Sequence, residues 1–306
     1  FYIPMFMGLN AVFGGVLWAW VLSPIFYYAD VSKAKTMPVM SNALYNASGH
    51  RYPIEDLFNA EQEWQQDVFD ANGVPYMSMW YALGYFFSFV SMTAGISHVA
   101  CYHRKDITQV MFSGTANKGA SRHALRMGDS QTNHLRVSGL ILGLVTIGIF
   151  IGMNYAYGIS MPWWAVLTAV AMALFFVIPI GAIQGITGNQ LGLNTLCELC
   201  GGLMLPHNPN GAILVKVTGY MAMNHALNLI ANMKAGQYLG IKYSDVYYMQ
   251  IWGTLVCCLS DASAYRLVMN ANLINNVEGW SSSALAVYET AAYMWGGIGP
   301  WEVWMG

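Results

Sequence analysis

The sequence is short of charge, and this excludes most functions of soluble proteins. The 306 residues include 13 Lys and Arg and 15 Asp and Glu, so only 9% are charged. A soluble domain carries about 25% charged residues. With so few cations, no basic patch is large enough to predict a nucleic-acid partner.

Other features of soluble enzymes and secreted proteins are also missing. The five cysteines lie in apolar stretches, which argues against a disulfide framework. His98 lies within an expected membrane span and His103 at its basic end, so the two histidines do not form a zinc motif. No nucleophile–base pair and no phosphate-binding loop stands out. We therefore predict no metal site, no cofactor and no enzymatic activity.

Hydrophobic residues are what the sequence has in quantity. They make up 56% of the chain, and the mean hydropathy is +0.40. The 11 Trp and 19 Tyr are typical of proteins whose aromatic side chains lie at the bilayer surface. We predict an all-α fold: a polytopic helical bundle in the lipid bilayer, with about seven or eight hydrophobic segments. The clearest expected spans are 1–28, 76–102, 137–157, 165–184, 212–233, 244–268 and 284–300.

The charges are unequally shared between the two longest polar segments. Residues 29–75 hold seven acidic residues against three basic ones. Residues 103–136 hold six basic residues against two acidic ones. Because basic loops stay on the cytosolic side of a membrane, we predict that 29–75 is extracellular and 103–136 is cytosolic. Residues 46–48, Asn-Ala-Ser, form a sequon for N-glycosylation in the first of these loops.

The stretch from Ile178 to Tyr220 begins as an apolar helix that glycines then interrupt, with polar residues among them. Helical spacing puts Gln190, Asn194 and Glu198 four residues apart on one face. A polar stripe with an acid is costly in lipid unless it lines a cavity or packs inside protein. We therefore predict a broken or re-entrant helix that forms a substrate site, as in transporters. The candidate substrate-binding residues are Asn189, Gln190, Asn194, Glu198, Lys216, Tyr220 and Asn224.

Part of this set belongs to a second polar stripe. Lys216, Tyr220 and Asn224 recur every four residues in the next expected helix, followed by Asn228 and Asn232. Such a face indicates a cavity that water can enter. The alternative is hydrogen bonding between neighbouring helices.

Three ionisable residues within expected spans are candidates for proton coupling: Glu198, His98 and Asp261. Desolvation favours the neutral form of a carboxyl group, so a buried Glu198 could take up a proton. Its alternative role is a fixed ion pair with Lys216. His98 titrates near neutral pH if unperturbed, and it is either a proton relay or a packing residue.

Several long runs in the chain carry a resemblance to a known family. The run NQLGLNTLCE at 189–198, followed by GGLMLP, HNPNGAILVK and TGY, resembles the central motif of the oligopeptide transporter (OPT) family. Further matching runs are FYIPMF, VLSPIFYY and SFVSMTAGISHVACYHRKDI, so the resemblance covers nearly the whole chain. Because family members are much longer, it implies that 1–306 is one transmembrane domain from the later half of a transporter.

The resemblance implies a proton-coupled importer in a eukaryotic plasma membrane. Members of the family import short peptides, glutathione or, in one branch, metal chelates. On this basis we expect alternating access driven by the proton gradient, with peptides and protons as partners. Glu198 would face an amino terminus or a proton, and Lys216 a carboxylate. The peptide bonds would meet Gln190, Asn194 and Asn224.

The sequence departs from the family pattern after the central motif. The family usually has a Lys-x-Pro-Pro-Arg box where this chain reads Gly-Ile-Lys-Tyr-Ser at 240–244. The segment 29–75 looks like that of the peptide branch, and a metal-chelate transporter is the alternative. An ion channel or an intramembrane enzyme would belong to another class, and neither has a positive signal in the sequence.

Overall fold

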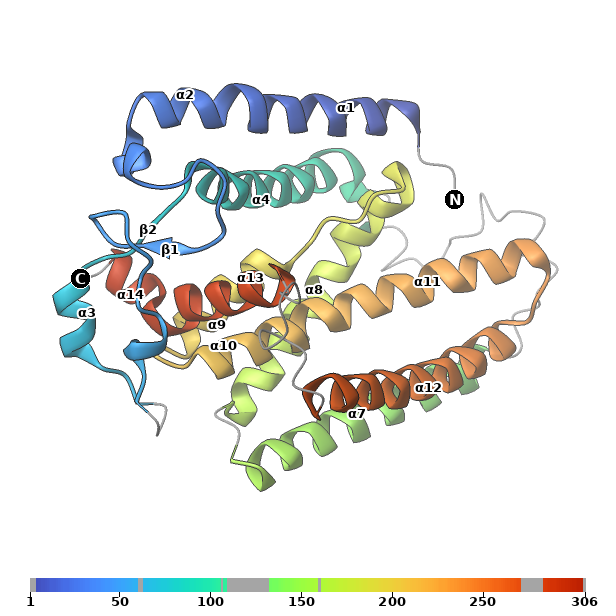
Figure 1. Ribbon diagram of the computed structural model, residues 1–306. Coiled ribbons are helices and arrows are strands. Elements are labelled where there is room, and N and C mark those ends of the chain that lie inside the picture. The colour runs from blue at the N-terminus through green and yellow to red at the C-terminus, as the bar shows by residue number, and fades with distance from the viewer. Residues whose placement is uncertain are drawn as a thin grey trace. The chain divides into compact units, whose positions relative to one another are not determined.

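The computed structural model describes residues 4–59, 63–105, 107–108, 132–158, 161–270 and 283–304. These residues are almost entirely helical, which confirms the predicted all-α class (Figure 1). Two compact units can be distinguished. The first comprises Phe1–Cys101, Tyr157–Ala222 and Ala284–Gly306, and the second comprises Tyr102–Ala156 and Met223–Ser283.

The first unit holds most of the helices and the one small sheet among the described residues. Its elements are α1 (Met5–Val16), η1 (Leu17–Leu22), α2 (Ser23–Tyr28), η2 (Val31–Thr36), β1 (Leu44–Tyr45), η3 (Glu55–Leu57), α3 (Gln66–Asn72), β2 (Tyr76–Met77), α4 (Met79–His98), η4 (Val99–His103), α8 (Trp163–Thr187), α9 (Asn194–Met204), α10 (Pro209–Lys216), η7 (Val217–Met221), α13 (Ser283–Ala292), η8 (Tyr293–Ile298) and α14 (Gly299–Trp304). Of these, η1, η4, η7 and η8 are π turns that continue an α-helix, and η2 and η3 are short 3₁₀ helices.

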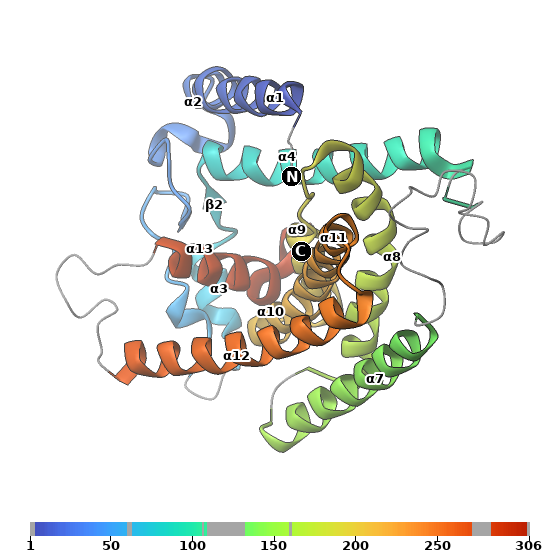
Figure 2. The ribbon, with the colours of Figure 1, turned by 90° about the vertical axis from the view of Figure 1, so that its right-hand side faces the viewer.

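The second unit consists of α7 (Thr132–Ala156), α11 (Ala222–Leu239) and α12 (Tyr243–Asn270). Figures 1 and 2 both show α7 and α12 side by side. The side chain of Asn232 donates to Gln250 Oε1 at 3.0 Å and joins α11 to α12. Residues 240–244, where the family box is absent, form the turn between these helices, with Gly240 in the left-handed region at φ 74°.

Four described helices are long and apolar enough to cross a membrane. They are Met5–Tyr28, Met79–His103, His134–Ala156 and Trp163–Thr187, which confirms four of the predicted spans to within a few residues. The remaining predicted spans coincide with helices at 209–239, 243–270 and 283–304. Most of the basic segment 103–136 lies outside the described residues, so its cytosolic placement stays a prediction.

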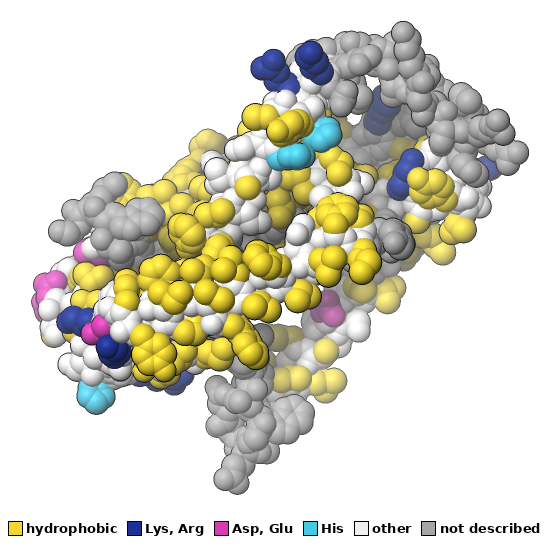
Figure 3. Space-filling view, turned by 90° about the horizontal axis from the view of Figure 1, so that it is seen from above, with side chains coloured by type: hydrophobic (Ala, Val, Ile, Leu, Met, Phe, Trp, Pro, Cys, Tyr) yellow, Lys and Arg dark blue, Asp and Glu magenta, His cyan; other side chains and the backbone are white. Residues whose placement is uncertain are grey.

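The first of these helices carries hydrophobic side chains on its outside. Met5, Leu9, Phe13 and Trp20 are each more than half exposed. Figure 3, which looks onto the structure from above, shows hydrophobic side chains in a row along this helix. An apolar face of this length is what lipid or another membrane helix covers.

The predicted break after the fourth span is confirmed. Helix α8 ends at Thr187, and Gly188 caps it in the left-handed conformation at φ 71°. A glycine is favoured there because it lacks the Cβ that disfavours positive φ. Residues 189–193 are not helical, and α9 begins at Asn194. The expectation that helical spacing would align Gln190 with Asn194 is therefore wrong, because the helix stops before Gln190.

Helix α9 is too short to cross a bilayer by itself. Its 11 residues extend about 16 Å at about 1.5 Å per residue, whereas the hydrocarbon core is about 30 Å thick. After α9 the chain turns through residues 205–208 and returns as α10, and the two helices pack together as a hairpin. Residues 188–193, which we call the linker, connect α8 to α9 without helical structure.

The linker and α9 both contact α4. Near the end of α4, a Cβ placed on Gly95 would lie 2.5 Å from Leu191 Cδ1 and 2.7 Å from Ile183 Cδ1. The linker therefore packs closely against this end of α4. The turn at 205–208 instead contacts residues 29–78, the segment that precedes α4.

Residues 29–78, which we call the cap, form a packed structure that the polar composition did not predict. Strands β1 and β2 pair antiparallel with Leu44 opposite Met77. Buried Leu44, Leu57 and Phe69 share an apolar core with side chains of η8, an element more than 200 residues later in the chain. Tyr52 donates to the carbonyl of Gly73 at 2.8 Å, and burial raises the pKa of its phenol to about 12.

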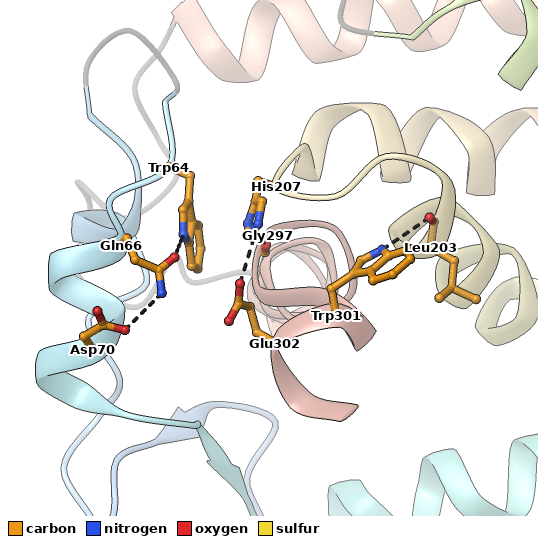
Figure 4. A network of polar contacts seen from close by, with 8 residues as sticks. All are labelled: Trp64, Gln66, Asp70, Leu203, His207, Gly297, Trp301 and Glu302. Atoms are coloured by element: carbon orange, nitrogen blue, oxygen red, sulfur yellow. Dashed lines mark hydrogen bonds and ion pairs between the residues drawn. The ribbon is translucent and has the colours of Figure 1, made fainter. Parts of the chain in front are cut away.

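His207 connects the hairpin turn to the cap and to the C-terminal helices, as Figure 4 shows. Its ring lies against that of Trp64 in the cap, with centroids 4.6 Å apart. Its Nδ1 is 3.2 Å from the carbonyl oxygen of Gly297, and its Nε2 is 3.7 Å from a carboxylate oxygen of Glu302. The turn between α9 and α10 is therefore held at the cap end of the first unit.

Two glycines of α9 allow its close approach to neighbouring backbone. A Cβ on Gly201 would lie 2.9 Å from the carbonyl oxygen of Ala212 in α10. A Cβ on Gly202 would overlap the carbonyl oxygen of Trp295 in η8. Because the clashing atoms are backbone, they cannot move aside as a flexible side chain could.

We predict that Gly202→Ala lowers the stability of the full-length protein by about 1–3 kcal/mol, the usual cost of overpacking. The measurement is the midpoint of thermal unfolding in detergent. Gly148→Ala in α7 is the matched control, because a Cβ there meets nothing within 4 Å. Equal midpoints for the two variants would contradict the close packing of α9 against η8.

The extracellular placement of the cap stays a prediction, and Asn46 offers its test. The sequon lies at a turn in which Asn46 Oδ1 accepts from the backbone N–H groups of Ser48 and His50, each at 3.0 Å. We expect the full-length protein from eukaryotic cells to lose mass on treatment with an N-glycosidase, and the Asn46→Gln and Ser48→Ala variants not to. Asn72→Gln is the control that keeps the glycan. A glycan on a sequon introduced into 103–136, together with none at Asn46, would show that the predicted orientation is wrong.

Candidate functional site

The first unit contains a cavity of about 610 Å³. It is bounded by η1, the start and middle of α4, the linker before α9, the first turns of α9, the end of α10 and α13. Its polar lining comes from Asn42, Tyr81, Tyr85, Ser88, Ser91, Asn194, Thr195, Glu198, Lys216 and Tyr288. Its apolar lining includes Trp18, Trp80, Phe87, Met92, Leu191, Val287 and Ala291. A volume of this order is typical of small-molecule sites.

Two opposite charges meet in this cavity. The Nζ of Lys216 donates to Oε1 of Glu198, and the side chains are 15% and 7% exposed. The two residues come from the two arms of the α9–α10 hairpin, Glu198 from near the start of α9 and Lys216 from the end of α10. A buried charge needs such a partner, because desolvation alone would cost each ion several kcal/mol.

Aromatic side chains surround the ion pair. Lys216 Nζ lies 4.7 Å from the centre of the Tyr288 ring, a distance at which a cation is attracted to the ring face. The hydroxyl groups of Tyr81 and Tyr85 are 3.0 Å apart, and both tyrosines line the cavity together with Glu198. The site therefore offers one anion, one cation and several hydroxyl groups within an aromatic enclosure.

Three of the predicted substrate-binding residues line the cavity together. Asn194 and Glu198 are four residues apart in α9 and therefore face the same way, and Lys216 meets Glu198 from α10. The ion pair, which the sequence offered as one role of Glu198, is present. The break before Asn194 places this residue in the first turn of a helix that begins beside the cavity.

The other predicted substrate-binding residues are not among those that line it. Asn189 is exposed in the linker, and Gln190 is half-buried there. Tyr220 is half-buried in the π turn η7, four residues beyond Lys216. Asn224 lies in α11 in the second unit, where Asn228 donates to its side-chain oxygen at 3.4 Å. Their roles in binding stay predictions.

The other two candidates for proton coupling are both exposed. His98 is the last residue of α4, and Asp261 lies on α12 in the second unit. Glu198 is the one candidate of the three that the structure places in the cavity. Among the described residues, no group of three or more His, Cys, Asp or Glu side chains is placed to hold a metal ion.

Sequence reasoning placed Ser88 and Ser91 toward the helical bundle, but it missed the aromatic side of the cavity, where Trp18 and Trp80 lie. Trp80, Gly84, Ser88 and Ser91 follow one another at intervals of three or four residues and all line it, so one face of α4 forms a wall. Their spacing was a usable signal. Trp18 had none, because an aromatic residue near the end of a membrane span is equally expected at the lipid surface.

Comparisons with known proteins agree on one family. The family described as OPT oligopeptide transporter protein matches residues 1–306. Oligopeptide transporter 7 of Arabidopsis thaliana is 30% identical over 302 residues, which are 97% of this chain and 39% of that protein. Oligopeptide transporter 8 of the same plant is 29% identical over 311 residues, with coverage of 97% and 42%. The sexual differentiation process protein isp4 of Schizosaccharomyces pombe is 25% identical over 302 residues, with coverage of 97% and 38%.

The chain spans about two fifths of the length of the curated relatives that it matches. No solved structure matches the chain.

We predict that Glu198 and Lys216 are energetically coupled. Either Glu198→Gln or Lys216→Met should destabilise the full-length protein by about 3–5 kcal/mol, because each leaves one buried charge without its counter-ion. The double variant should recover most of this loss, since it buries no charge. Thermal unfolding of the four proteins in detergent gives the coupling free energy, and Lys242→Met, at an exposed lysine, is the control. Additive effects of the two substitutions would contradict a closed pair.

Proposed function

The chain belongs to the OPT oligopeptide transporter family, which consists of membrane transporters, and on this basis we propose that it forms part of a proton-coupled carrier of short peptides. The observation that carries the proposal is the buried Glu198–Lys216 pair in the cavity beside a broken helix. Transporters place their substrate sites at such breaks, where side chains and freed backbone groups can reach a ligand.

The charges of the cavity fit a molecule that carries both signs. A peptide has an ammonium group at one end and a carboxylate at the other. When the two side chains separate to admit a peptide, its ammonium can pair with Glu198 and its carboxylate with Lys216, so that every buried charge stays paired. An anion or a cation alone would leave one member of the pair without a partner. The hydroxyl and amide groups of Ser88, Ser91 and Asn194 are available for the peptide bonds.

The same pair provides a route from proton binding to substrate binding. Protonation of Glu198 removes the charge that holds Lys216 and leaves the lysine available for the substrate carboxylate. The neutral carboxyl group of Glu198 still accepts a hydrogen bond from the peptide ammonium. Binding of a proton and binding of a peptide then favour each other, because coupling between two ligands is reciprocal. In this scheme the proton gradient supplies the energy, and no cofactor is needed.

The position of the cavity along α4 fits alternating access. The lining extends from Trp80, in the first turn of α4 next to the cap, to Met92. Beyond it, the linker packs closely against α4 at Gly95. If the cap is extracellular, the cavity lies on the outer side of this contact, and separating Leu191 from Gly95 would lead toward the cytosol.

We predict that Glu198→Gln abolishes the pH-driven accumulation of a labelled tetrapeptide by cells that express the full-length protein. Uptake is normalised to surface expression, because loss of the counter-ion of Lys216 also destabilises the protein. Exchange of labelled for unlabelled peptide should persist, since exchange needs no net proton movement. Glu289→Gln in α13 is the control, because Glu289 is exposed and does not line the cavity.

Uptake by Glu198→Gln with an unchanged dependence on pH would refute the assignment of Glu198. The same cells distinguish the alternative substrate class. Competition by unlabelled tetrapeptides, and none by iron chelates, is the result expected of a peptide carrier. The reverse pattern would favour a metal-chelate carrier.

A further inference from the structure

The cavity has a second region that the charged pair does not use. Trp18 of η1 and Trp80 of α4 stack at this side, with ring centroids 4.0 Å apart and planes inclined by 27°. Both line the cavity, and Asn42 of the cap lines it with them. Stacked indole rings form a flat apolar wall that favours contact with an aromatic or large apolar group.

A glycine keeps the space in front of this wall open. Gly84 lies one turn after Trp80 on the cavity face of α4. A Cβ at Gly84 would be 3.7 Å from Cζ2 of Trp18, an ordinary van der Waals distance. Packing of Trp18 against α4 therefore does not require a glycine here. The missing side chain instead leaves volume in the cavity.

The position of Trp18 is fixed by local hydrogen bonds. It lies in the π turn η1, in which the backbone N–H of Ser23 donates to the Trp18 carbonyl. The Ser23 hydroxyl donates to the same carbonyl at 2.8 Å, and Ser23 is buried. Single π turns within α-helices are frequent at functional sites. In addition, the indole Nε1 of Trp18 is buried without an acceptor among the described residues.

The aromatic wall and the acid of the ion pair line the same cavity. Trp80 and Gly84 lie on α4 next to Tyr81 and Tyr85, which line this cavity together with Glu198. From Trp80 to Met92 the cavity face of α4 extends about 18 Å at about 1.5 Å per residue. This is enough for roughly five residues of an extended peptide at about 3.5 Å each. A peptide whose ammonium group is at Glu198 can extend its first side chain toward the wall within the same cavity.

We propose that Trp18, Trp80 and Gly84 form a subsite for an aromatic or large apolar side chain on the amino-terminal residue of the peptide. The proposal rests on the proposed function, in that Glu198 is taken to hold the peptide ammonium. The subsite would make the carrier prefer peptides with such a residue at the amino terminus, whereas the charged pair alone would accept any peptide.

Binding of amino-acid amides to the purified full-length protein tests the subsite without transport. The probes are phenylalanine amide and alanine amide, which share the ammonium group and differ in the side chain. Calorimetry should give at least about tenfold tighter binding of phenylalanine amide, as expected for burying an aromatic side chain. Gly84→Leu should remove this preference by filling the subsite, whereas Gly84→Ala should retain most of it. Trp18→Phe tests the wall with a smaller ring and should weaken the preference.

Uptake by cells tests whether the subsite takes the side chain of the amino-terminal residue in particular. Phe-Ala-Ala-Ala should compete for labelled tetrapeptide about tenfold better than Ala-Ala-Ala-Phe, and Gly84→Leu should bring the two together. Equal binding of the two amides, or a preference that Gly84→Leu leaves unchanged, would overturn the subsite. If the amides bind as expected and no peptide is taken up, the subsite stands and the proposed transport function fails.

Discussion

The buried pair of Glu198 and Lys216 is the constraint around which the first unit is arranged. Two charges can be removed from water only if they stay together, and here they come from separate arms of a helical hairpin. The pair therefore fixes how α9 lies against α10. It also requires the arms to come close, and Gly201 permits this because any Cβ there would meet the backbone of α10. The charge pair and the glycine face of α9 are thus two parts of one packing arrangement.

The broken helix gives this arrangement its place beside a cavity. A continuous helix from α8 would satisfy its own backbone and present no free groups to a ligand. Ending α8 at Gly188 and restarting at Asn194 leaves the intervening backbone and the first turn of α9 next to α4. At the other end, His207 holds the hairpin turn against the cap and Glu302. The hairpin is therefore anchored at its turn, while its charged arms border open space.

Four of the predicted membrane spans are confirmed because apolar length has a direct physical consequence, and the break is confirmed because clustered glycines and polar residues end a helix. The grouping of Asn194, Glu198 and Lys216 at one site could also be predicted, from the spacing within α9 and from the complementary charges of Glu198 and Lys216. The prediction failed at Gln190, because a helical period was carried across Gly188 and Gly192, where the helix does not exist. The core of the cap and the Trp18–Trp80 wall depend on contacts between residues far apart in sequence, which no local pattern specifies.

The central claim is that peptide and proton share the Glu198–Lys216 pair. Its most direct test is the number of protons exchanged when a tetrapeptide binds to the purified full-length protein. Calorimetry in buffers of different ionisation enthalpy measures this number. The account predicts a net change in bound protons for the unmodified protein and none for Glu198→Gln. Peptide binding that exchanges the same number of protons in both proteins would contradict it.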